Sequence, residues 1–315
     1  MVTLSVKDLS VKYQSQGKRV QAVDHVTFSS NETESIGIAG ESGCGKSTLG
    51  LAVIKALQEN ASVSGEILFD GKSILSMPNS EFTKDMRWKQ ISMVFQGAMN
   101  SLDPVYTIGD QMSEIMEQHH FRGNIAEKIS ESLKQVGLDQ SITKRYPHEL
   151  SGGMKQRVII AMALLLEPDV VIADEPTTAL DVLVQAQIIN LLKRLKKEKG
   201  MTVILITHDM AIISEIADKI GIMYAGQLVE FGSAVEIYRN PKHPYSHALI
   251  AAIPKLHSDD KQIHFIKGNP PNMLDLSSGC RFYERCPYAM NICKQDPPQI
   301  ITQTGYTLCW LYKES

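Results

Sequence analysis

The chain has 315 residues, of which 43% are hydrophobic, and a formal net charge of -3 at pH 7. This length suffices for one large domain with an appendage or for two domains, and the lack of a basic excess argues against a nucleic-acid partner. No apolar run approaches the roughly 18 residues of a membrane-spanning helix, and the N-terminal sequence MVTLSVKDLS has no signal core, so we expect a cytoplasmic protein.

The N-terminal part combines two kinds of apolar pattern. Residues 1–30 alternate apolar and polar side chains, which predicts antiparallel strands with a turn near Gly17. Residues 35–39 form a short apolar run that ends in a glycine-rich loop, and a helix is expected over 46–57. Residues 65–70 and 91–96 are predicted as two further strands.

The central part alternates helical and strand patterns. Residues 97–165 contain few β-branched runs and several helical patterns, which predicts a helical insert. Two continuous apolar strands at 169–173 and 202–207 follow, with a helical stretch between them. Buried strands that alternate with helices predict a parallel sheet covered on both faces, and therefore an α/β fold.

The clearest motif is the loop at 40–47, GESGCGKS, which fits G-x-x-x-x-G-K-[ST] without a mismatch. It lies between a predicted strand and a predicted helix, where backbone N–H groups and the helix N-terminus can bind phosphates. Lys46 is expected to reach the β- and γ-phosphates of a nucleotide, and Ser47 to bind Mg²⁺. Cys44 is interpreted as a small loop residue and not as a redox switch. The residues predicted to bind ATP here are Gly40, Ser42, Gly43, Cys44, Gly45, Lys46, Ser47 and Thr48.

Two carboxylates, Asp174 and Glu175, follow the apolar run 169–173. At the end of a parallel strand they are expected at the carboxyl edge of the sheet, facing the phosphate loop. Asp174 suits the Mg²⁺ shell, directly or through water. Glu175 suits a general base or water-positioning group for attack on the γ-phosphate.

A third motif indicates which of the many protein classes with a phosphate loop this chain resembles. Residues 150–156, LSGGMKQ, resemble the LSGGQ-type signature of ABC ATPases, and they lie between Lys46 and the Asp174–Glu175 strand as in that family. Other landmarks of the family follow in order along residues 1 to about 230: Tyr13 as the aromatic that stacks on adenine, Gln96 in the Q-loop, Asp181 in the D-loop and His208 as the switch histidine.

The resemblance implies a P-loop NTPase core of the ABC type, with an antiparallel β subdomain and a helical subdomain. It also implies that Ser151, Gly152 and Gly153 begin a helix and contact ATP held by an opposite subunit, with Asp181 nearby. His208 is expected to donate to the γ-phosphate, and Gln96 to touch Mg²⁺ and water, with its loop bearing on the membrane partner. Ser47, Gln96 and Asp174 are therefore the expected Mg²⁺ ligands.

Three longer stretches narrow the resemblance to the ATPases of oligopeptide, dipeptide and nickel importers. They are FQGAMNSLDPV, YPHELSGGMKQRVIIAMALLLEPDVVIADEPTTALDVLVQAQI and PKHPYSHALIAAIP. Met154-Lys155 replaces the single Gln of the generic signature, a variation that is common in this subgroup. The implied activity is ATP hydrolysis coupled to peptide uptake. The implied partners are two transmembrane permease subunits, a second homologous ATPase subunit and an extracytoplasmic peptide-binding protein, which would hold this chain at the cytoplasmic face of the membrane.

Other functions remain open on the sequence. Nickel or another small solute could replace the peptide as cargo. An ABC ATPase without a membrane partner is disfavoured because the chain has one cassette and no sustained heptads. A protein that binds ATP without turnover is disfavoured by the presence of Glu175 and His208.

Four of the five cysteines lie near the C-terminus, in a segment rich in proline. In a reducing compartment they are expected to bind metal, and their spacing alone leaves zinc and an iron–sulfur cluster equally open, with free thiols or disulfides as a third alternative. The sequence GCRFYERCPYAMNICKQDPP resembles the tail of peptide-importer ATPases that carry a 4Fe–4S cluster, with a structural role. The predicted ligands are Cys280, Cys286, Cys293 and Cys309.

The predicted domain organisation follows these patterns. A nucleotide-binding domain is expected over residues 1–240, with its helical subdomain at about 97–165. A C-terminal extension that holds the four cysteines is expected over residues 241–315, because proline and glycine become frequent there.

Overall fold

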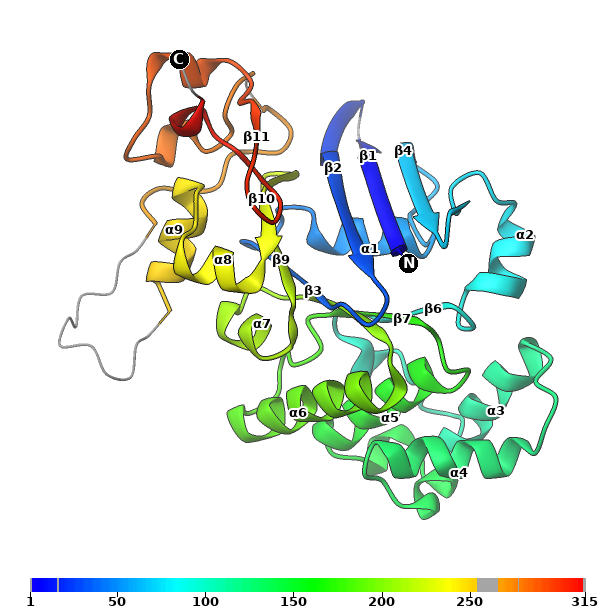
Figure 1. Ribbon diagram of the computed structural model, residues 1–315. Coiled ribbons are helices and arrows are strands. Elements are labelled where there is room, and N and C mark those ends of the chain that lie inside the picture. Colours follow the sequence, from blue (N-terminus) through cyan, green and yellow to red (C-terminus); the bar gives the residue numbers. More distant parts are fainter. Residues whose placement is uncertain (1, 16, 254–265, 277, 314–315) are drawn as a thin grey trace. The chain divides into compact units, whose positions relative to one another are not determined.

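The computed structural model describes residues 2–15, 17–253, 266–276 and 278–313 (Figure 1). The chain divides into two compact units. The first unit comprises Met1–Leu75 and Ile206–Ser315, and the second comprises Ser76–Leu205. The first unit therefore contains both the phosphate loop and the cysteine-rich segment.

One sheet of the first unit is antiparallel, as its alternating sequence predicts. Its strands have the order β2-β1-β4-β5, and neighbouring strands run in opposite directions. Leu4, Val6 and Val11 of β1 are fully buried, whereas Lys7 between them is exposed. Gly17 lies at the β1–β2 turn with a φ of 75°, which glycine adopts without strain. The strands are β1 (Val2–Ser15), β2 (Lys18–Asn31), β4 (Ala61–Phe69) and β5 (Lys72–Ser73).

A second sheet of this unit carries the phosphate loop at the end of β3. Its strands have the order β11-β12-β10-β9-β3, with β3 parallel to β9 and the other pairs antiparallel. All four residues of β3 are buried, as expected for a central strand. The strands are β3 (Ile36–Ala39), β9 (Lys219–Tyr224), β10 (Gln227–Ser233), β11 (Gln299–Ile301) and β12 (Tyr306–Leu308).

The C-terminal segment continues this second sheet. After β10 the described chain passes through α8 and α9, and it later returns so that Thr307 of β12 pairs with Glu230 of β10. The hydroxyl of Tyr306 donates to the carbonyl oxygen of Thr27 in β2 at 2.8 Å. The cysteine-rich segment is therefore tied to the core of its unit by strand pairing, and the domain boundary near residue 240 stays a prediction.

Short helices flank these sheets. Helix α1 contacts β1 and β2, α7 contacts β3, and α8 contacts β9 and β10. Helix α1 is shorter than the sequence pattern predicts, because Lys55 has a φ of 50° and a left-handed residue cannot continue a right-handed helix. The helices are α1 (Lys46–Val53), α7 (Met210–Ile216), α8 (Ala234–Arg239) and α9 (Pro244–Ala251), and 3-10 turns cover Tyr283–Arg285, Asn291–Lys294 and Trp310–Tyr312.

The second unit places helices around three buried strands. The strand order is β8-β7-β6, and β6 runs parallel to β7. Every residue of these strands is buried, which agrees with the continuous apolar runs in the sequence. The strands are β6 (Ile91–Val94), β7 (Val170–Asp174) and β8 (Thr202–Ile206), the last at the boundary of the unit.

Local capping explains where the helices of the second unit begin and end. Thr107 and Asp110 form a capping box at the start of α3, and Asn124 caps α4. Helix α6 ends at Gly200, which has a φ of 65°, after three lysines in its last turn. The helices are α2 (Asn79–Glu81), α3 (Ile108–Gln118), α4 (Ile125–Gln135), α5 (Gly152–Leu164) and α6 (Val182–Lys199), and a π turn covers Phe82–Met86.

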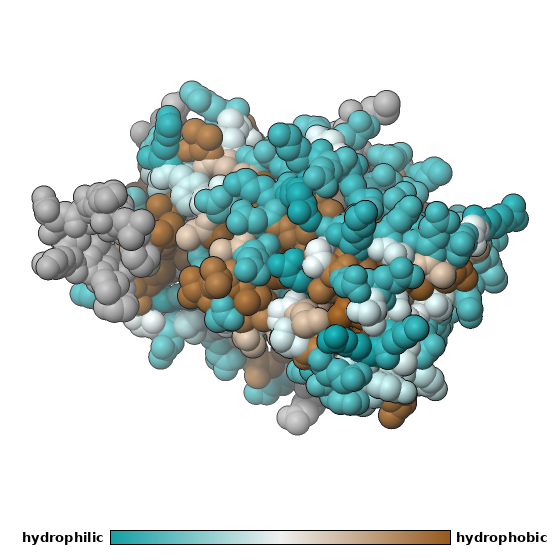
Figure 2. Space-filling model, turned by 90° about the horizontal axis from the view of Figure 1, so that it is seen from below, coloured by the Kyte–Doolittle hydropathy of each residue, from teal (hydrophilic) through white to brown (hydrophobic). Residues whose placement is uncertain are grey.

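The helices and the surface can be compared with what a membrane-spanning segment requires, which is a long and apolar helix. In the part of the chain that the structure describes, no helix combines the length and the apolar character needed to cross a bilayer. Figure 2 shows one face on which hydrophilic side chains predominate and hydrophobic side chains lie among them.

Candidate nucleotide-binding and catalytic site

The phosphate loop is held closely between neighbouring backbone segments of the first unit. A Cβ atom on Gly40 would lie 2.1 Å from the carbonyl oxygen of Met223, and one on Gly45 would lie 2.1 Å from that of Ala22. Both glycines also have positive φ values, 154° and 106°. No side chain fits at either position, so the glycines of the motif allow the loop to bend tightly against its surroundings.

Lys46 is buried at the N-terminus of α1, with 6% of its surface exposed. Its Nζ donates to the carbonyl oxygens of Gly40 at 2.7 Å and Glu41 at 2.9 Å, and lies 3.8 Å from the sulfur of Cys44. An ammonium group has three N–H donors, and sulfur is a weak acceptor. The loop therefore fixes the lysine with two strong hydrogen bonds and leaves one donor for a better acceptor, such as a phosphate oxygen.

Cys44 behaves as a packed loop residue, as interpreted from the sequence. It is 5% exposed, and burial raises the pKa of its thiol, so the thiol stays protonated at neutral pH. A protonated and inaccessible thiol reacts poorly. The carbonyl oxygen of Cys44 accepts a hydrogen bond from the N–H of Gly226 at 2.9 Å, which ties the loop to the β9–β10 turn.

His208 lies in the same unit as the phosphate loop, directly after β8. The preceding Thr207 donates its N–H to the carbonyl oxygen of Ile38 in β3, at 3.1 Å, and β3 leads into the phosphate loop. The following Asp209 caps α7 by accepting from the N–H of Ala211 at 2.8 Å. The exposed His208 side chain is thus carried on a backbone that is fixed on both sides.

Tyr13 also belongs to the first unit. It lies in β1, opposite Val20 of β2 and Ala61 of β4, and its side chain is partly exposed. Helix α1, which begins with Lys46, contacts β1 and β2. The antiparallel sheet that carries Tyr13 is therefore packed against the helix that follows the phosphate loop.

The second unit brings together the residues predicted to act on water. Gln96 follows β6 and Glu175 follows β7, and the two strands are parallel neighbours. The side-chain amide of Gln96 donates to Oε2 of Glu175 at 3.1 Å, and the hydroxyl of Thr178 donates to the same oxygen at 2.9 Å. Glu175 has a φ of 45°, a conformation that is uncommon for a residue with a side chain and is often found at functional sites.

Asp174 lies one residue earlier, as the last residue of β7. It is 2% exposed, whereas Glu175 is only partly buried. The strand ends between them, and the two carboxylates differ in burial despite their adjacency. This difference suits two roles, one in binding a cation and one in contacting water.

The signature sequence forms the N-terminus of α5. Ser151 caps the helix by accepting from the N–H of Met154 at 3.3 Å. A Cβ atom on Gly153 would lie 2.9 Å from the side chain of Val184 in α6. Asp181 in turn caps α6 by accepting from the N–H of Val184 at 2.9 Å. The two helix N-termini therefore lie side by side, and each offers backbone N–H groups and a partial positive charge to an anion.

Comparison with known proteins agrees with this geometry. Residues 23–178 match the ABC transporter family, and residues 229–293 match the C-terminal region of oligopeptide/dipeptide transporters. The chain is 45% identical to the oligopeptide transport ATP-binding protein OppD of Escherichia coli, over 94% of this chain and 88% of that protein. The chain is an ABC ATPase of the oligopeptide/dipeptide transporter family. It is also 43% identical to the dipeptide transport ATP-binding protein DppD of Caldanaerobacter subterraneus, over 99% and 98% of the two chains.

Solved structures confirm the fold of this ABC ATPase. The ATP-binding cassette MJ0796, solved as a dimer in a post-hydrolysis state bound to ADP and Pi, superposes with a TM-score of 0.65 at 29% identity, covering 73% of this chain and 98% of that one. The structure of cbiO1 from Clostridium perfringens, part of an ABC transporter complex, superposes with a TM-score of 0.64 at 30% identity, covering 76% of this chain and 91% of that one. The predicted P-loop α/β fold and ATPase activity are therefore confirmed.

The four C-terminal cysteines of this ABC ATPase lie within electrostatic range of one another. Burial, with a smaller contribution from the other cysteines of the set, raises the pKa values of Cys280 and Cys309 to about 11. Burial also raises the pKa of Cys286, with a contribution from Cys293. All four are free thiols that metal binding would have to deprotonate.

This arrangement does not by itself form a metal centre. Among the described residues, no group of three or more His, Cys, Asp and Glu side chains could hold a metal ion. Only Cys280, Cys286 and Cys293 lie within residues 229–293, which match the transporters' C-terminal region, and Cys309 lies beyond it. The predicted 4Fe–4S cluster and the zinc alternative therefore both stay predictions.

Sequence reasoning missed a set of residues that connect the C-terminal segment with the phosphate loop. Glu41 occupies a variable position of the G-x-x-x-x-G-K-[ST] motif, and the two arginines beside the cysteines belong to no motif. Most of their interactions join residues more than 200 positions apart in the chain, for example 244 positions for Arg285 and Glu41, and the contact of Arg285 with Tyr224 spans 61 positions. The only available signal was the position of Arg281 and Arg285 next to Cys280 and Cys286. The residues of this set are Asp24, Glu41, Tyr224, Tyr245, Arg281 and Arg285.

Proposed function

We propose that this ATPase couples ATP binding and hydrolysis to the uptake of dipeptides or oligopeptides through partner permease subunits. The observation that carries the proposal is the match of residues 229–293 to the C-terminal region of oligopeptide/dipeptide transporters, in the same chain as the nucleotide motifs. Relatives named for both oligopeptide and dipeptide transport are 40–45% identical to it. Uptake of nickel or another small solute is the alternative that an uptake assay must separate.

The proposed nucleotide site takes residues from each unit. In the first unit, Lys46 and the loop N–H groups bind the phosphates, with Ser42, Gly43 and Thr48 alongside, and Tyr13 stacks on adenine. His208 donates to the γ-phosphate and responds to its loss. The preformed hydrogen bonds of Lys46 to the loop reduce the reorganisation that binding requires, because the charge is already in place.

Glu175 is proposed to act on the water that attacks the γ-phosphate. Its Oε2 already accepts two hydrogen bonds, from Gln96 and Thr178. These bonds hold the carboxylate in one orientation, in which it can accept a proton or a hydrogen bond from water. Gln96 thus serves as a positioning residue for Glu175 as well as a ligand near the phosphates.

Mg²⁺ is proposed to bind to Ser47, Gln96 and Asp174. A hydroxyl, an amide and a carboxylate are the oxygen donors that this hard cation prefers, so the donor set fits the ion. When bound, Mg²⁺ neutralises phosphate charge during transfer. Asp174 is 2% exposed, and a buried carboxylate gains most from a cation that compensates its charge.

A second ATPase subunit is proposed to complete each nucleotide site. The N-termini of α5 and α6, with Ser151, Gly152, Gly153 and Asp181, would meet the ATP of the opposite subunit. Val182 and Leu183, directly after Asp181, are 81% and 72% exposed, which suits a protein–protein contact. The second subunit is a homologous ATPase in the transporter, and the isolated chain would pair with itself.

Membrane partners are proposed to contact the segment after Gln96. Val105 and Tyr106 in that segment are 70% and 56% exposed, and Phe95 is 43% exposed. Exposed apolar side chains near the Q-loop suit a surface that permease subunits cover and that senses the state of Gln96. The chain would then work at the cytoplasmic face of the membrane and receive peptides from an extracytoplasmic binding protein through the permeases.

Solute uptake in cells tests the proposed cargo. In a strain that lacks this chain, the wild-type gene should restore uptake of labelled tripeptide, and a Glu175→Gln variant should not. Labelled nickel serves as the control solute in the same cells. Restored nickel uptake without restored peptide uptake would contradict the proposal and favour the alternative.

The four-cysteine segment is proposed to hold a 4Fe–4S cluster with a structural role. Zinc bound by four thiolates at about 2.3 Å would bring the sulfurs to roughly 3.8 Å from one another. The described thiols interact electrostatically but include no group that could hold a single ion. A 4Fe–4S cluster is also held by four cysteine thiolates, so the donor set fits it as well as zinc, and metal analysis decides between the two.

Absorption spectroscopy and metal analysis test this part. Protein purified without oxygen should be brown, with a broad band near 400 nm and about four irons per chain. Cys286→Ser should lose most of the absorbance, whereas Cys44→Ser, in the phosphate loop, should keep it. A colourless protein with one zinc per chain would contradict the cluster and show that the segment holds a zinc site.

A further inference from the structure

Glu41 lies in the phosphate loop and is held at three points. Its carbonyl oxygen accepts from Nζ of Lys46 at 2.9 Å, and its N–H donates to the hydroxyl of Tyr245 in α9 at 3.0 Å. Its carboxylate accepts two hydrogen bonds from Arg285, from Nη1 to Oε2 at 2.8 Å and from Nη2 to Oε1 at 2.9 Å. The conformation of this loop position therefore depends on α9 and on the cysteine-rich segment.

Arg285 is the best enclosed member of this contact. Its side chain is 6% exposed, against 27% for that of Glu41. Its Nη1 also donates to the hydroxyl of Tyr224 at 3.2 Å, and its Nε donates to the carbonyl oxygen of Lys267 at 3.0 Å. The guanidinium lies 5.9 Å from the ring centroid of Phe282. A planar group fixed on several sides presents its two parallel N–H donors to the carboxylate in one orientation.

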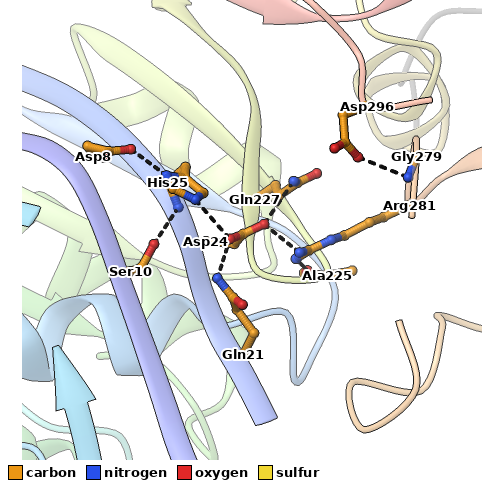
Figure 3. A network of polar contacts seen from close by, with 10 residues as sticks. All are labelled: Asp8, Ser10, Gln21, Asp24, His25, Ala225, Gln227, Gly279, Arg281 and Asp296. Atoms are coloured by element: carbon orange, nitrogen blue, oxygen red, sulfur yellow. Dashed lines mark hydrogen bonds and ion pairs between the residues drawn. The ribbon is translucent and has the colours of Figure 1, made fainter. Parts of the chain in front are cut away.

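A second arginine anchors the same segment independently. Figure 3 shows Arg281 reaching the carboxylate of Asp24 in β2, which also accepts from Gln227. Arg281 further donates to the carbonyl oxygen of Ala225. The segment thus has its own attachment to the core, so a change at Arg285 is expected to alter the phosphate loop without releasing the segment.

The charge of Glu41 creates a requirement that Arg285 meets. A nucleotide brings several negative charges into the loop, and a carboxylate within the loop opposes their entry. Pairing with the guanidinium of Arg285 offsets this charge and holds both carboxylate oxygens on the arginine. An unpaired Glu41 would repel phosphate and would compete with it for the Lys46 donor that has only the weak acceptor Cys44.

We propose that Arg285 is a positioning residue for nucleotide binding: it neutralises and orients Glu41 so that the phosphate loop accepts the phosphates of ATP. The inference rests on the proposed role of residues 40–47 as the phosphate site. It assigns to the cysteine-rich segment a direct influence on ATP affinity. Arg285 itself takes no part in the chemistry, because it acts through Glu41.

Equilibrium binding of a fluorescent ATP analogue to the purified full chain, with steady-state ATPase kinetics, tests the proposal. Arg285→Gln keeps much of the side-chain length and packing but removes the charge. It should weaken ATP binding about tenfold and raise KM by a similar factor, because one pair of charged hydrogen bonds to Glu41 is lost. The value of kcat should change less than about twofold, because the loss affects bound ATP and the transition state equally. Arg285→Lys, which keeps the charge and loses the paired geometry, should be intermediate.

The double variant Glu41→Gln/Arg285→Gln separates charge neutralisation from simple support. Removing the carboxylate should restore ATP affinity to within about threefold of the wild type, because no uncompensated charge is left. Lys294→Gln, an exposed change in the same segment, is the matched control and should leave binding unchanged. Thermal unfolding of each variant shows whether it is folded.

Two results would overturn the proposal. They are a double variant that binds as weakly as Arg285→Gln, and an Arg285→Gln variant with wild-type affinity. If Arg285→Gln does not fold, Arg285→Lys and its combination with Glu41→Gln decide by the same comparison. Lys46→Ala in the same assay separates the phosphate-loop assignment from the role of Arg285. Unchanged ATP binding by Lys46→Ala would contradict the phosphate-loop assignment. Lost binding by Lys46→Ala together with wild-type binding by Arg285→Gln would contradict only the role of Arg285.

Discussion

The nucleotide motifs of this ABC ATPase are each formed by neighbouring residues, whereas its four-cysteine segment is held in place by residues that are distant in sequence. The phosphate loop lies within eight consecutive residues, 40–47, and is recognisable from its sequence alone. The cysteine-rich segment has weak local patterns and is organised by partners far away in sequence, such as Asp24 for Arg281. A local motif can be identified from its own residues, whereas the interactions of a segment stabilised by distant contacts can be identified only when the fold is known.

Glu175→Gln is the change with the largest expected effect on the nucleotide motifs. It should retain ATP binding and lower turnover by roughly 10²–10⁴-fold, because a positioned base is removed while the phosphate contacts remain. Steady-state ATPase rates and binding of labelled ATP measure the two effects. Glu59→Gln, an exposed change, is the control. Turnover that stays near the wild-type rate would remove Glu175 from the catalytic assignment.

Arg281→Ala is expected to have the next largest effect, on the cysteine-rich segment. Its side chain and that of Asp24 are each 10% exposed, so the change leaves a buried carboxylate without its cation. We expect a loss of about 3–5 kcal/mol in the free energy of unfolding, measured by urea denaturation. The double variant Asp24→Ala/Arg281→Ala should cost clearly less than the sum of the two single changes. Additive losses would show that the pair does not stabilise the fold.

Gly40→Ala probes the local nature of the phosphate loop. The added Cβ would lie 2.1 Å from the carbonyl oxygen of Met223, at a φ of 154°. We expect a destabilisation of about 2–3 kcal/mol and loss of ATP binding, because the loop must move to relieve the overlap. Gly71→Ala, which has positive φ but no atom within 4 Å, is a control for the backbone strain alone. Equal effects of the two changes would contradict the close contact.

His243→Asn should have the smallest effect, and only below neutral pH. His243 is 1% exposed, and burial lowers its pKa to about 3 from an ordinary value near 6.5. The unfolded chain therefore binds more protons between these values, so the free energy of unfolding falls as pH decreases from 6.5. This histidine contributes at most about 1.4 kcal/mol per pH unit.

The variant isolates that contribution from other titrating groups, including Glu230, which accepts from the N–H of His243 and whose pKa burial raises. Asparagine can replace the histidine as the cap of α9, which accepts from Tyr245. Thermal unfolding at pH 7.0 and 5.0 should show a smaller loss for the variant than for the wild type. Equal losses would mean that His243 is protonated in the folded protein.

The motifs of the proposed nucleotide site could be identified from the sequence because each of them is short and local. The contact between Gln96 and Glu175 was not predictable from the sequence, because it depends on β6 and β7 being parallel neighbours, and no local pattern records the strand order. The end of α1 before Lys55 was not predictable from the apolar pattern, which continues to Leu57. A single left-handed residue ends the helix without leaving a trace in hydrophobic spacing.

By itself, the sequence determined the fold class, the family and the residues of the nucleotide motifs, because backbone turns and helix N-termini that bind phosphate arise from a few neighbouring residues. Only the tertiary structure decided that β12 pairs with β10 and that Arg285 reaches Glu41. Ion pairs between residues 244 positions apart depend on strand order and on the packing around them, and no local pattern records either. The connection between the cysteine-rich segment and the phosphate loop is therefore a property of the folded chain.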